Sequence, residues 1–184
     1  MKIPKNKYIK VTHNFVVPPD KYEHADYDAD IFCLPLKAVG IVESKDELVF
    51  YNNLFNKNKS IGLYRDCISG CGDCGTDSLC VDLSNIPDEE KTILVLSHLY
   101  KAHERGISFL DGVSEVVFTE LEQPMKCHGK TIMSQSLSPK ASGSDTIELC
   151  RLIRNGHEWE VVFSNDSMAE PDFPKYLGSF GVVF

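Results

Sequence analysis

The stretch TIELCRLIRNGHEWEVVF, residues 146–163, decides the fold class of this chain. Polar and apolar side chains alternate over Thr146–Leu149 and again over Trp159–Phe163, which is the pattern of a half-buried β-strand. Asn155 and Gly156 stand between the two runs, and both residue types tolerate the positive φ angles of a two-residue hairpin turn. The stretch therefore predicts two antiparallel strands joined by a tight turn.

The same signal recurs along the rest of the chain. Runs rich in β-branched and aromatic residues are separated by clusters of Gly, Pro, Asn and Asp. They are Tyr8–Phe15, Ile31–Leu36, Glu47–Tyr51, Leu79–Leu83, Thr92–Tyr100, Val113–Leu121, Thr146–Ile153 and Trp159–Phe163. Helix signals are limited to Lys101–Arg105 and Pro171–Leu177. The chain is therefore predicted to be all-β, a two-sheet antiparallel β-sandwich with one or two short helices.

Length and composition set the class of protein. The 184 residues, 42% of them hydrophobic and 25% charged, suffice for a single domain, residues 1–184, with its own core. The polar segment Lys126–Gly143 has no periodicity and is predicted to be a long mobile loop. The formal net charge of −8 argues against a nucleic-acid surface, which needs clustered Lys and Arg.

The sequence also bears on location. No window approaches roughly 18 consecutive apolar residues, so no transmembrane segment is expected. The first residues, Met1–Lys7, are not followed by the apolar core of a signal peptide. The seven cysteines are an odd number, and without an export signal reduced thiols are expected. These features predict a cytoplasmic protein.

Side-chain oxygen is concentrated in three stretches, each beside a predicted strand. They are Asp26–Asp30, Phe50–Asn53 and the loop Asp66–Asp82, which carries Asp73 and Asp77. In a sandwich the three can meet at one end, where carboxylates without balancing Lys or Arg repel one another unless a cation binds. Calcium takes about six to eight such oxygen ligands. The stretches together predict a calcium site.

Each stretch taken alone has a simpler interpretation. An acidic run is often just a solvated loop, and paired asparagines favour turns. Asp28 and Asp30, however, are two residues apart on extended backbone, so their side chains point the same way. They form a pair of carboxylates at the start of a predicted strand.

The cysteines of the third stretch offer a different metal hypothesis. Their spacing is C-x3-C-x2-C-x5-C, formed by Cys67, Cys71, Cys74 and Cys80. Four thiols within one loop can bind zinc or another soft metal. Only one C-x-x-C is present, so ordinary reduced cysteines are the simpler interpretation. The surrounding acids should also raise the pKa values of these thiols and slow their reactions.

No motif indicates catalysis. Gly70–Gly75 fits the expression G-x-G-x-x-G, but a strand rather than a helix follows it and Asp73 would repel a pyrophosphate. Cys127 and His128 are neighbours in sequence, whereas a catalytic Cys–His pair depends on spatial geometry and a third, orienting group. The protein is therefore expected not to be an enzyme.

The order of these segments along the chain resembles that of the tellurium-resistance TerD family of calcium-binding stress proteins. The most specific match is Leu48–Asn53, which is similar to the family's D-F-V-F-Y-N-N. Asp28–Phe32 resembles D-L-D-A, Arg65–Gly70 falls at G-D-N-x-T-G, Val81–Pro87 matches V-D-L-S-x-V-P, and Glu148–Trp159 resembles G-E-L-Y-R-H-x-G-E-W. The resemblance runs from about residue 8 to the last residues.

This resemblance implies two adjacent calcium sites at one end of a β-sandwich, a role in responses to tellurite, phage, colicin or oxidative stress, and no enzymatic activity. By position it implies the ligands Asp28, Asp30, Asn52, Asn53 and Asp66. The family has a run like G-E-G-D-D-E where this chain keeps only Asp73 and Asp77. One calcium site is therefore expected to be weaker, lost, or altered by the nearby thiols.

The expectation is thus a cytoplasmic calcium-binding stress protein in which calcium orders acidic loops and creates a surface for other proteins of a stress-response system. The predicted ligands are Asp28, Asp30, Asn52, Asn53, Asp66, Asp73 and Asp77. Two alternatives stay open. One is a zinc or soft-metal thiol protein that uses the Cys67–Cys80 loop, and the other is an inert scaffold whose long polar loop binds a partner.

Overall fold

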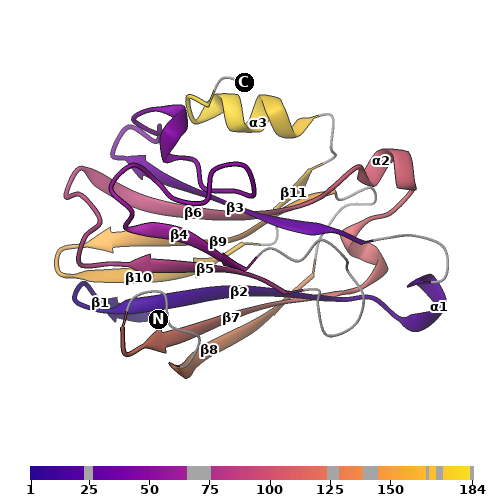
Figure 1. The fold of residues 1–184 in the computed structure, drawn as a ribbon, viewed down its shortest axis with the longest axis horizontal. Helices are drawn as coiled ribbons and strands as arrows, with labels where there is room; N and C mark the ends of the chain where they lie inside the picture. The colour runs from indigo at the N-terminus through magenta and orange to yellow at the C-terminus, as the bar shows by residue number, and fades with distance from the viewer. Residues whose placement is uncertain are drawn as a thin grey trace.

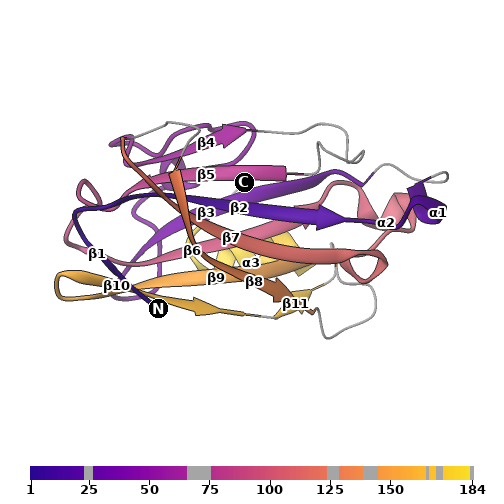
Figure 2. The same cartoon turned by 90° about the horizontal axis from the view of Figure 1, so that it is seen from below.

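Two antiparallel sheets stack face to face in the computed structural model, which describes residues 1–22, 27–65, 76–123, 129–138, 145–164, 166–168 and 172–182 (Figure 1). The six-stranded sheet has the order β1 (Lys2–Pro4), β10 (Glu158–Phe163), β9 (Thr146–Asn155), β6 (Glu90–Leu99), β3 (Ala29–Lys37), with β11 (Ser167–Met168) also paired to β9. The five-stranded sheet, seen from its side of the molecule in Figure 2, has the order β4 (Ile61–Arg65), β5 (Thr76–Asp82), β2 (Tyr8–Val16), β7 (Val113–Leu121), β8 (Gly129–Leu137). The predicted all-β sandwich is confirmed.

The main core lies between the sheets and follows from strand alternation. Every second residue of β2 points inward, so Ile9, Val11, His13 and Phe15 are buried, while Tyr8, Lys10 and Asn14 on the other face lie at intermediate depth. Trp159 enters the same core from β10, and the Arg154 guanidinium lies 4.4 Å from its ring centroid. Facing residues from both sheets exclude water, which is the main favourable contribution to stability.

A second core covers the outer face of the six-stranded sheet. Helix α3 (Phe173–Ser179) packs Phe173 and Leu177 on this face, against residues of β3 and β6 (Figure 1). Glu148 anchors the helix, because its carboxylate accepts a hydrogen bond of 3.0 Å from Tyr176 Oη. The same carboxylate accepts two hydrogen bonds of 2.8 Å from the Arg151 guanidinium. Because both of its faces are covered, β3 is apolar without alternation over most of its length.

The helices are short. Besides α3, they are α1 (Pro19–Tyr22), α2 (Ala102–Arg105) and the 3-10 helices η1 (Lys45–Glu47) and η3 (Phe109–Asp111). The predicted helix at Lys101–Arg105 is confirmed as α2, and the one at Pro171–Leu177 corresponds to α3. None of the helices within the described residues is long and apolar enough to cross a membrane.

Two sequence predictions were wrong. Glu47–Tyr51 is not a strand: it runs from η1 into a tight turn. Two of its residues make isolated bridges, Val49 to Cys33 and Phe50 to Asn53. The predicted loop Lys126–Gly143 contains strand β8, while residues 126–128 and 139–143 lie outside the described residues. β8 is an edge strand with most side chains exposed, so its sequence needs no apolar alternation and reads as a loop.

The hairpin that sets the fold class forms as predicted, with its turn one residue later. β9 pairs with β10 antiparallel, and Asn155 pairs with Glu158. The two loop residues are therefore Gly156 and His157. Gly156 supplies the positive φ, +62°, at the first loop position, which fits the glycine preference of such turns.

Candidate functional site

Asp28 and Asp30 stand at the start of β3, at the end of the molecule where α2 lies (Figure 1). Tyr27 and Ile31 belong to the core between the sheets, so strand alternation puts both aspartates on the other face of β3. The Tyr100 N–H donates to the Asp28 carbonyl over 2.8 Å and continues the β3–β6 ladder beyond the strand. The two carboxylates share a face, as the sequence predicts.

Asp77 reaches the same place from the other sheet. It lies near the start of β5, is only 3% exposed, and shares the inward side of that strand with Leu79. The Ile31 N–H donates to Asp77 Oδ2 over 3.1 Å. Because Ile31 directly follows Asp30, this hydrogen bond brings carboxylates from both sheets to the start of β3.

The two asparagines lie in the turn Phe50–Asn53. The side-chain NH2 of Asn53 donates to the carbonyls of Asp46 and Leu48 over 3.1 and 2.7 Å. An amide has one oxygen, so Oδ1 is the side-chain atom of Asn53 that remains for a cation. Asn52 is exposed. Asn53 thus stabilises the turn whether or not it also serves as a ligand.

Aromatic rings connect this turn to β3. Phe50 stacks on Phe32 with ring centroids 5.5 Å apart, and Phe173 of α3 meets Phe32 edge-on at 5.0 Å. His98 pairs with Asp30 in the strand register and stacks on Phe173 at 4.4 Å. Sequence reasoning missed this cluster, because alternation within a strand shows only which face His98 occupies and not which helix covers it.

The remaining predicted ligands, Asp66 and Asp73, lie outside the described residues. Their segment joins β4, which ends at Arg65, to β5, which begins at Thr76, so it re-enters the fold beside Asp77. Within the described ranges, no group of three or more His, Cys, Asp and Glu side chains is arranged to hold a metal ion. The donors placed at the start of β3 are carboxylates, which suits a hard cation. The full ligand set stays a prediction.

The cysteines of the alternative metal hypothesis are divided. Cys67, Cys71 and Cys74 lie outside the described residues, as do Cys127 and His128, whereas Cys80 is buried in β5. Two further thiols, Cys33 and Cys150, are buried in the main core, and burial raises the pKa of each. Neutral thiols are poor nucleophiles and poor metal ligands, so these two are structural.

His13 is a polar residue that sequence reasoning left without a role. It is buried between the sheets and pairs with Asp77 in the β2–β5 register. Neither ring nitrogen has a hydrogen-bond partner among the described residues, and the ring lies 5.7 Å from Phe109. Burial lowers the pKa of His13 to about 3, so the ring is neutral at physiological pH.

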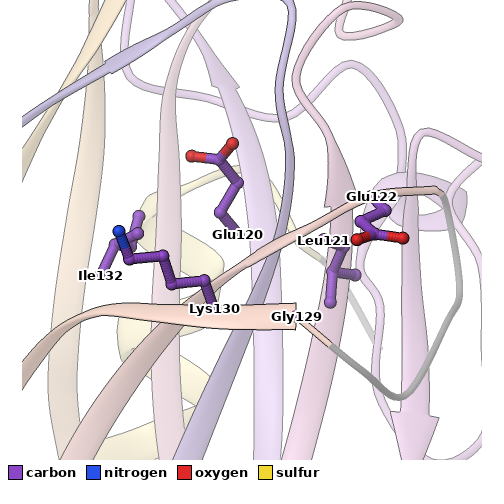
Figure 3. Close-up of a pocket in the computed structure, with 6 residues that line it drawn as sticks. All are labelled: Glu120, Leu121, Glu122, Gly129, Lys130 and Ile132. Carbon is purple, nitrogen blue, oxygen red and sulfur yellow. The ribbon is translucent and has the colours of Figure 1, made fainter.

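A cavity of about 650 Å³ lies elsewhere, at the far end of the β7–β8 pair (Figure 3). Its lining residues are Glu120, Leu121, Glu122, Gly129, Lys130 and Ile132. Glu120 forms an ion pair with Lys7 over 2.6 Å, and the charged side chains of the lining are at least partly open to solvent. Volume alone does not make a site, and Asp77 lies toward the other end of the five-stranded sheet.

A model of the TerD domain family matches residues 3–170. The chain belongs to the TerD domain family. A tellurium resistance protein TerD from Serratia marcescens is 31% identical over 84 residues, 46% of this chain and 44% of that protein. The match thus spans less than half of that relative's length.

Two solved structures share the TerD-domain fold seen here. A homologue of the telluride resistance protein TerD from Streptomyces coelicolor A3(2) superposes with a TM-score of 0.66 and 13% identity, covering 89% of this chain and 91% of that one. A protein of unknown function superposes with a TM-score of 0.63 and 13% identity, covering 87% and 88%. The family resemblance seen in the sequence is confirmed.

Proposed function

We propose that this TerD-domain chain is a cytoplasmic, non-enzymatic calcium-binding protein of the tellurium-resistance type that acts in a stress response. Calcium binds at the start of β3, orders the acidic loops there and creates a surface for a partner protein. The name of the Serratia relative, a tellurium resistance protein, supports the resistance role.

The observation that carries the calcium proposal is the hydrogen bond from the Ile31 N–H to Asp77 Oδ2. It places one carboxylate of the five-stranded sheet against the backbone of β3, at the residue that follows Asp30. Like charges gathered in this way repel, and a divalent cation converts the repulsion into attraction. Asp28, Asp30 and the second oxygen of Asp77 are the described groups at the start of β3 that would hold the ion. Asn53 stays a predicted ligand, because its side chain is bonded to the Asp46 and Leu48 carbonyls.

Calorimetric titration of EDTA-treated protein at physiological salt tests this proposal. Calcium should bind the wild type, and the double variant Asp28→Asn, Asp30→Asn should bind at least about 100-fold more weakly, because lower ligand charge loosens calcium sites by orders of magnitude. Asp172→Asn is the matched control, since Asp172 is exposed and makes no capping hydrogen bond. No binding below about 1 mM would overturn the proposal.

The loop-ordering mechanism has its own readout. Calcium should slow amide hydrogen exchange at Tyr100 and Ile31, whose N–H groups bond to Asp28 and Asp77. Exchange that stays the same with calcium bound would contradict the mechanism while leaving the site intact. A thermal shift with zinc alone, abolished by thiol alkylation, would instead favour the Cys67–Cys80 loop.

A further inference from the structure

Two glutamates are buried at the opposite end of β3 from the candidate calcium site. Glu90, the first residue of β6, pairs with Lys37, the last residue of β3, while Asp30 pairs with His98 eight residues further along β6. At ~3.3 Å per residue the two positions on β6 are about 26 Å apart. Glu47, the last residue of η1, is the other member of what we call the Glu47–Glu90 pair.

Both glutamates of this pair are buried, and their carboxyl oxygens have few hydrogen-bond donors. Glu90 is 3% exposed and Glu47 is 7% exposed. Glu47 Oε2 accepts from Asn56 Nδ2 over 3.2 Å, but Glu90 Oε2 is buried with no hydrogen-bond partner. A buried carboxylate without a donor is costly when charged, and such groups usually become neutral instead.

The charges around Glu90 act mostly in one direction. Burial and the nearby charge of Glu47 raise the pKa of Glu90 to about 7, with smaller contributions from Glu89 and Glu43. Lys37 on β3 opposes them. Arg154 of β9 also lies nearby, but its guanidinium donates to the main-chain carbonyl of Glu90 and to other acceptors in the connection before β6.

The segment that carries Glu47 is attached to the sheet by few bonds. Within η1 and just after it, the Leu48 N–H donates to the Lys45 carbonyl, and Val49 exchanges two hydrogen bonds of 2.9 Å with Cys33 at the free edge of β3. Leu48 packs into the core under α3. A repulsive contact between Glu47 and Glu90 would therefore act on the attachment of residues 44–49.

We propose that the buried, unpartnered carboxyl of Glu90 keeps its proton in the folded protein, and that loss of this proton loosens residues 44–49, which carry the buried Glu47, from the start of β6. The Glu47–Glu90 pair is thus a pH-sensitive contact built into the fold, separate from the candidate calcium site. Loss of the proton leaves two like charges in a poorly hydrated place, and the segment must move outward to hydrate them.

The sign of the pH dependence follows from proton binding. The folded pKa of Glu90, about 7, lies above the unfolded value of 4.5, so the folded state binds more protons between these pH values. The stabilisation is fully present below pH 4.5 and is lost as pH rises through 7. Glu90→Gln, which mimics the protonated side chain, should remove this dependence.

The test is the difference in thermal midpoint between Glu90→Gln and wild type, measured in EDTA from pH 5 to 8.5. We expect the two midpoints to agree at pH 5 and Glu90→Gln to be higher by several degrees at pH 8.5. Glu89→Gln is the matched control, because Glu89 is the exposed neighbour and its variant should follow the wild-type profile. A difference that does not change with pH would overturn the proposal.

Two further measurements keep the test decisive. If Glu90→Gln does not fold, Glu47→Gln is the second variant. It should move the transition to lower pH and make it smaller, because the charge of Glu47 raises the pKa of Glu90 and the variant removes that charge. At pH 8, the Leu48 and Val49 amides should exchange faster in wild type than in Glu90→Gln, and equal rates would contradict local loosening. A stabilisation by magnesium or calcium at pH 8 that Glu90→Gln abolishes would make the pair a cation site instead.

Discussion

The two ends of β3 both bury carboxylates, yet they treat them differently. At the start of the strand, Asp77 receives the backbone N–H of Ile31. At the other end, Glu90 Oε2 receives no donor and lies near a second carboxylate, Glu47. A hydrogen bond to the charged form stabilises it, whereas burial without one favours the neutral acid. The donors that the fold supplies to a buried carboxylate therefore matter beside burial itself.

The largest expected effect is a loss of stability in acid, and it belongs to the end of the molecule where β3 starts. His13, next to Asp77 in the strand register, has its pKa lowered to about 3 by burial. The unfolded state takes up a proton near pH 6.5 and the folded state only near pH 3, so stability falls as pH drops through this window. At pH 4, His13→Leu should be more stable than wild type by about 3 kcal/mol.

Urea unfolding of both proteins at pH 7 and pH 4 measures this difference. The control is His157→Gln, since His157 is exposed in the β9–β10 turn and its variant should keep the wild-type acid sensitivity. Equal acid sensitivity of His13→Leu and wild type would show that another group controls the acid limb. The Glu90 end should respond in the opposite direction over pH 4.5–7, which sharpens the contrast.

Asp77→Ala should have the next largest effect. It removes a charged acceptor and leaves the buried Ile31 N–H without a partner, which costs about 2–3 kcal/mol. Asp77→Asn retains an acceptor oxygen and should lose clearly less. Chemical denaturation in EDTA measures both variants, and similar losses would mean that the hydrogen bond to Ile31 contributes little.

Glu90→Leu should stabilise the protein by about 1–3 kcal/mol at pH 8, because it replaces an unpartnered buried acid by an apolar side chain. The same change should have a smaller effect at pH 5, where the carboxyl is already neutral. Denaturation at the two pH values provides the measurement. Destabilisation at pH 8 would show that the charged form of Glu90 is well accommodated after all.

The smallest expected effect concerns the paired asparagines. Asn53→Ala removes hydrogen bonds to the Asp46 and Leu48 carbonyls and should cost about 1 kcal/mol. Asn52→Ala should change stability by less than about 0.5 kcal/mol, because Asn52 is exposed. Thermal melts in EDTA compare them, and equal losses would contradict the turn-stabilising role assigned to Asn53 alone.

Most of the fold could be predicted because most of its strands have at most one face turned to solvent, and this leaves a recognisable apolar pattern in the sequence. Alternation identifies β2, β9 and β10, and the apolar run Ile31–Leu36 identifies β3, which is covered on both sides. This pattern does not identify the edge strand β8, since neither of its faces must be apolar along its length. The segment Glu47–Tyr51 misleads in the opposite way: its apolar residues pack on the sheet without joining it.

The candidate site could be predicted only as far as local spacing reaches. Asp28 and Asp30 share a face because they are two residues apart, a rule that needs no tertiary structure. Nothing local shows that Ile31 donates to Asp77 or that His13 lacks partners, because both facts depend on how two distant strands approach. Glu90 ends the run Asp88–Glu90, which looks like a solvated acidic turn in the sequence, although Glu90 itself is buried.

The position of α3 in the chain has a consequence for how the protein is made. On the ribosome, β3 emerges long before Phe173 and Leu177, which cover its outer face. The nascent chain therefore carries the apolar residues Phe32 and Leu34 uncovered through most of translation. In the same way, β1 has no pairing partner until β10 has been synthesised. Such distant pairings make folding slow and expose the incomplete sheet to aggregation. Native packing is completed only after all of the described strands have been synthesised, because α3 follows the last of them.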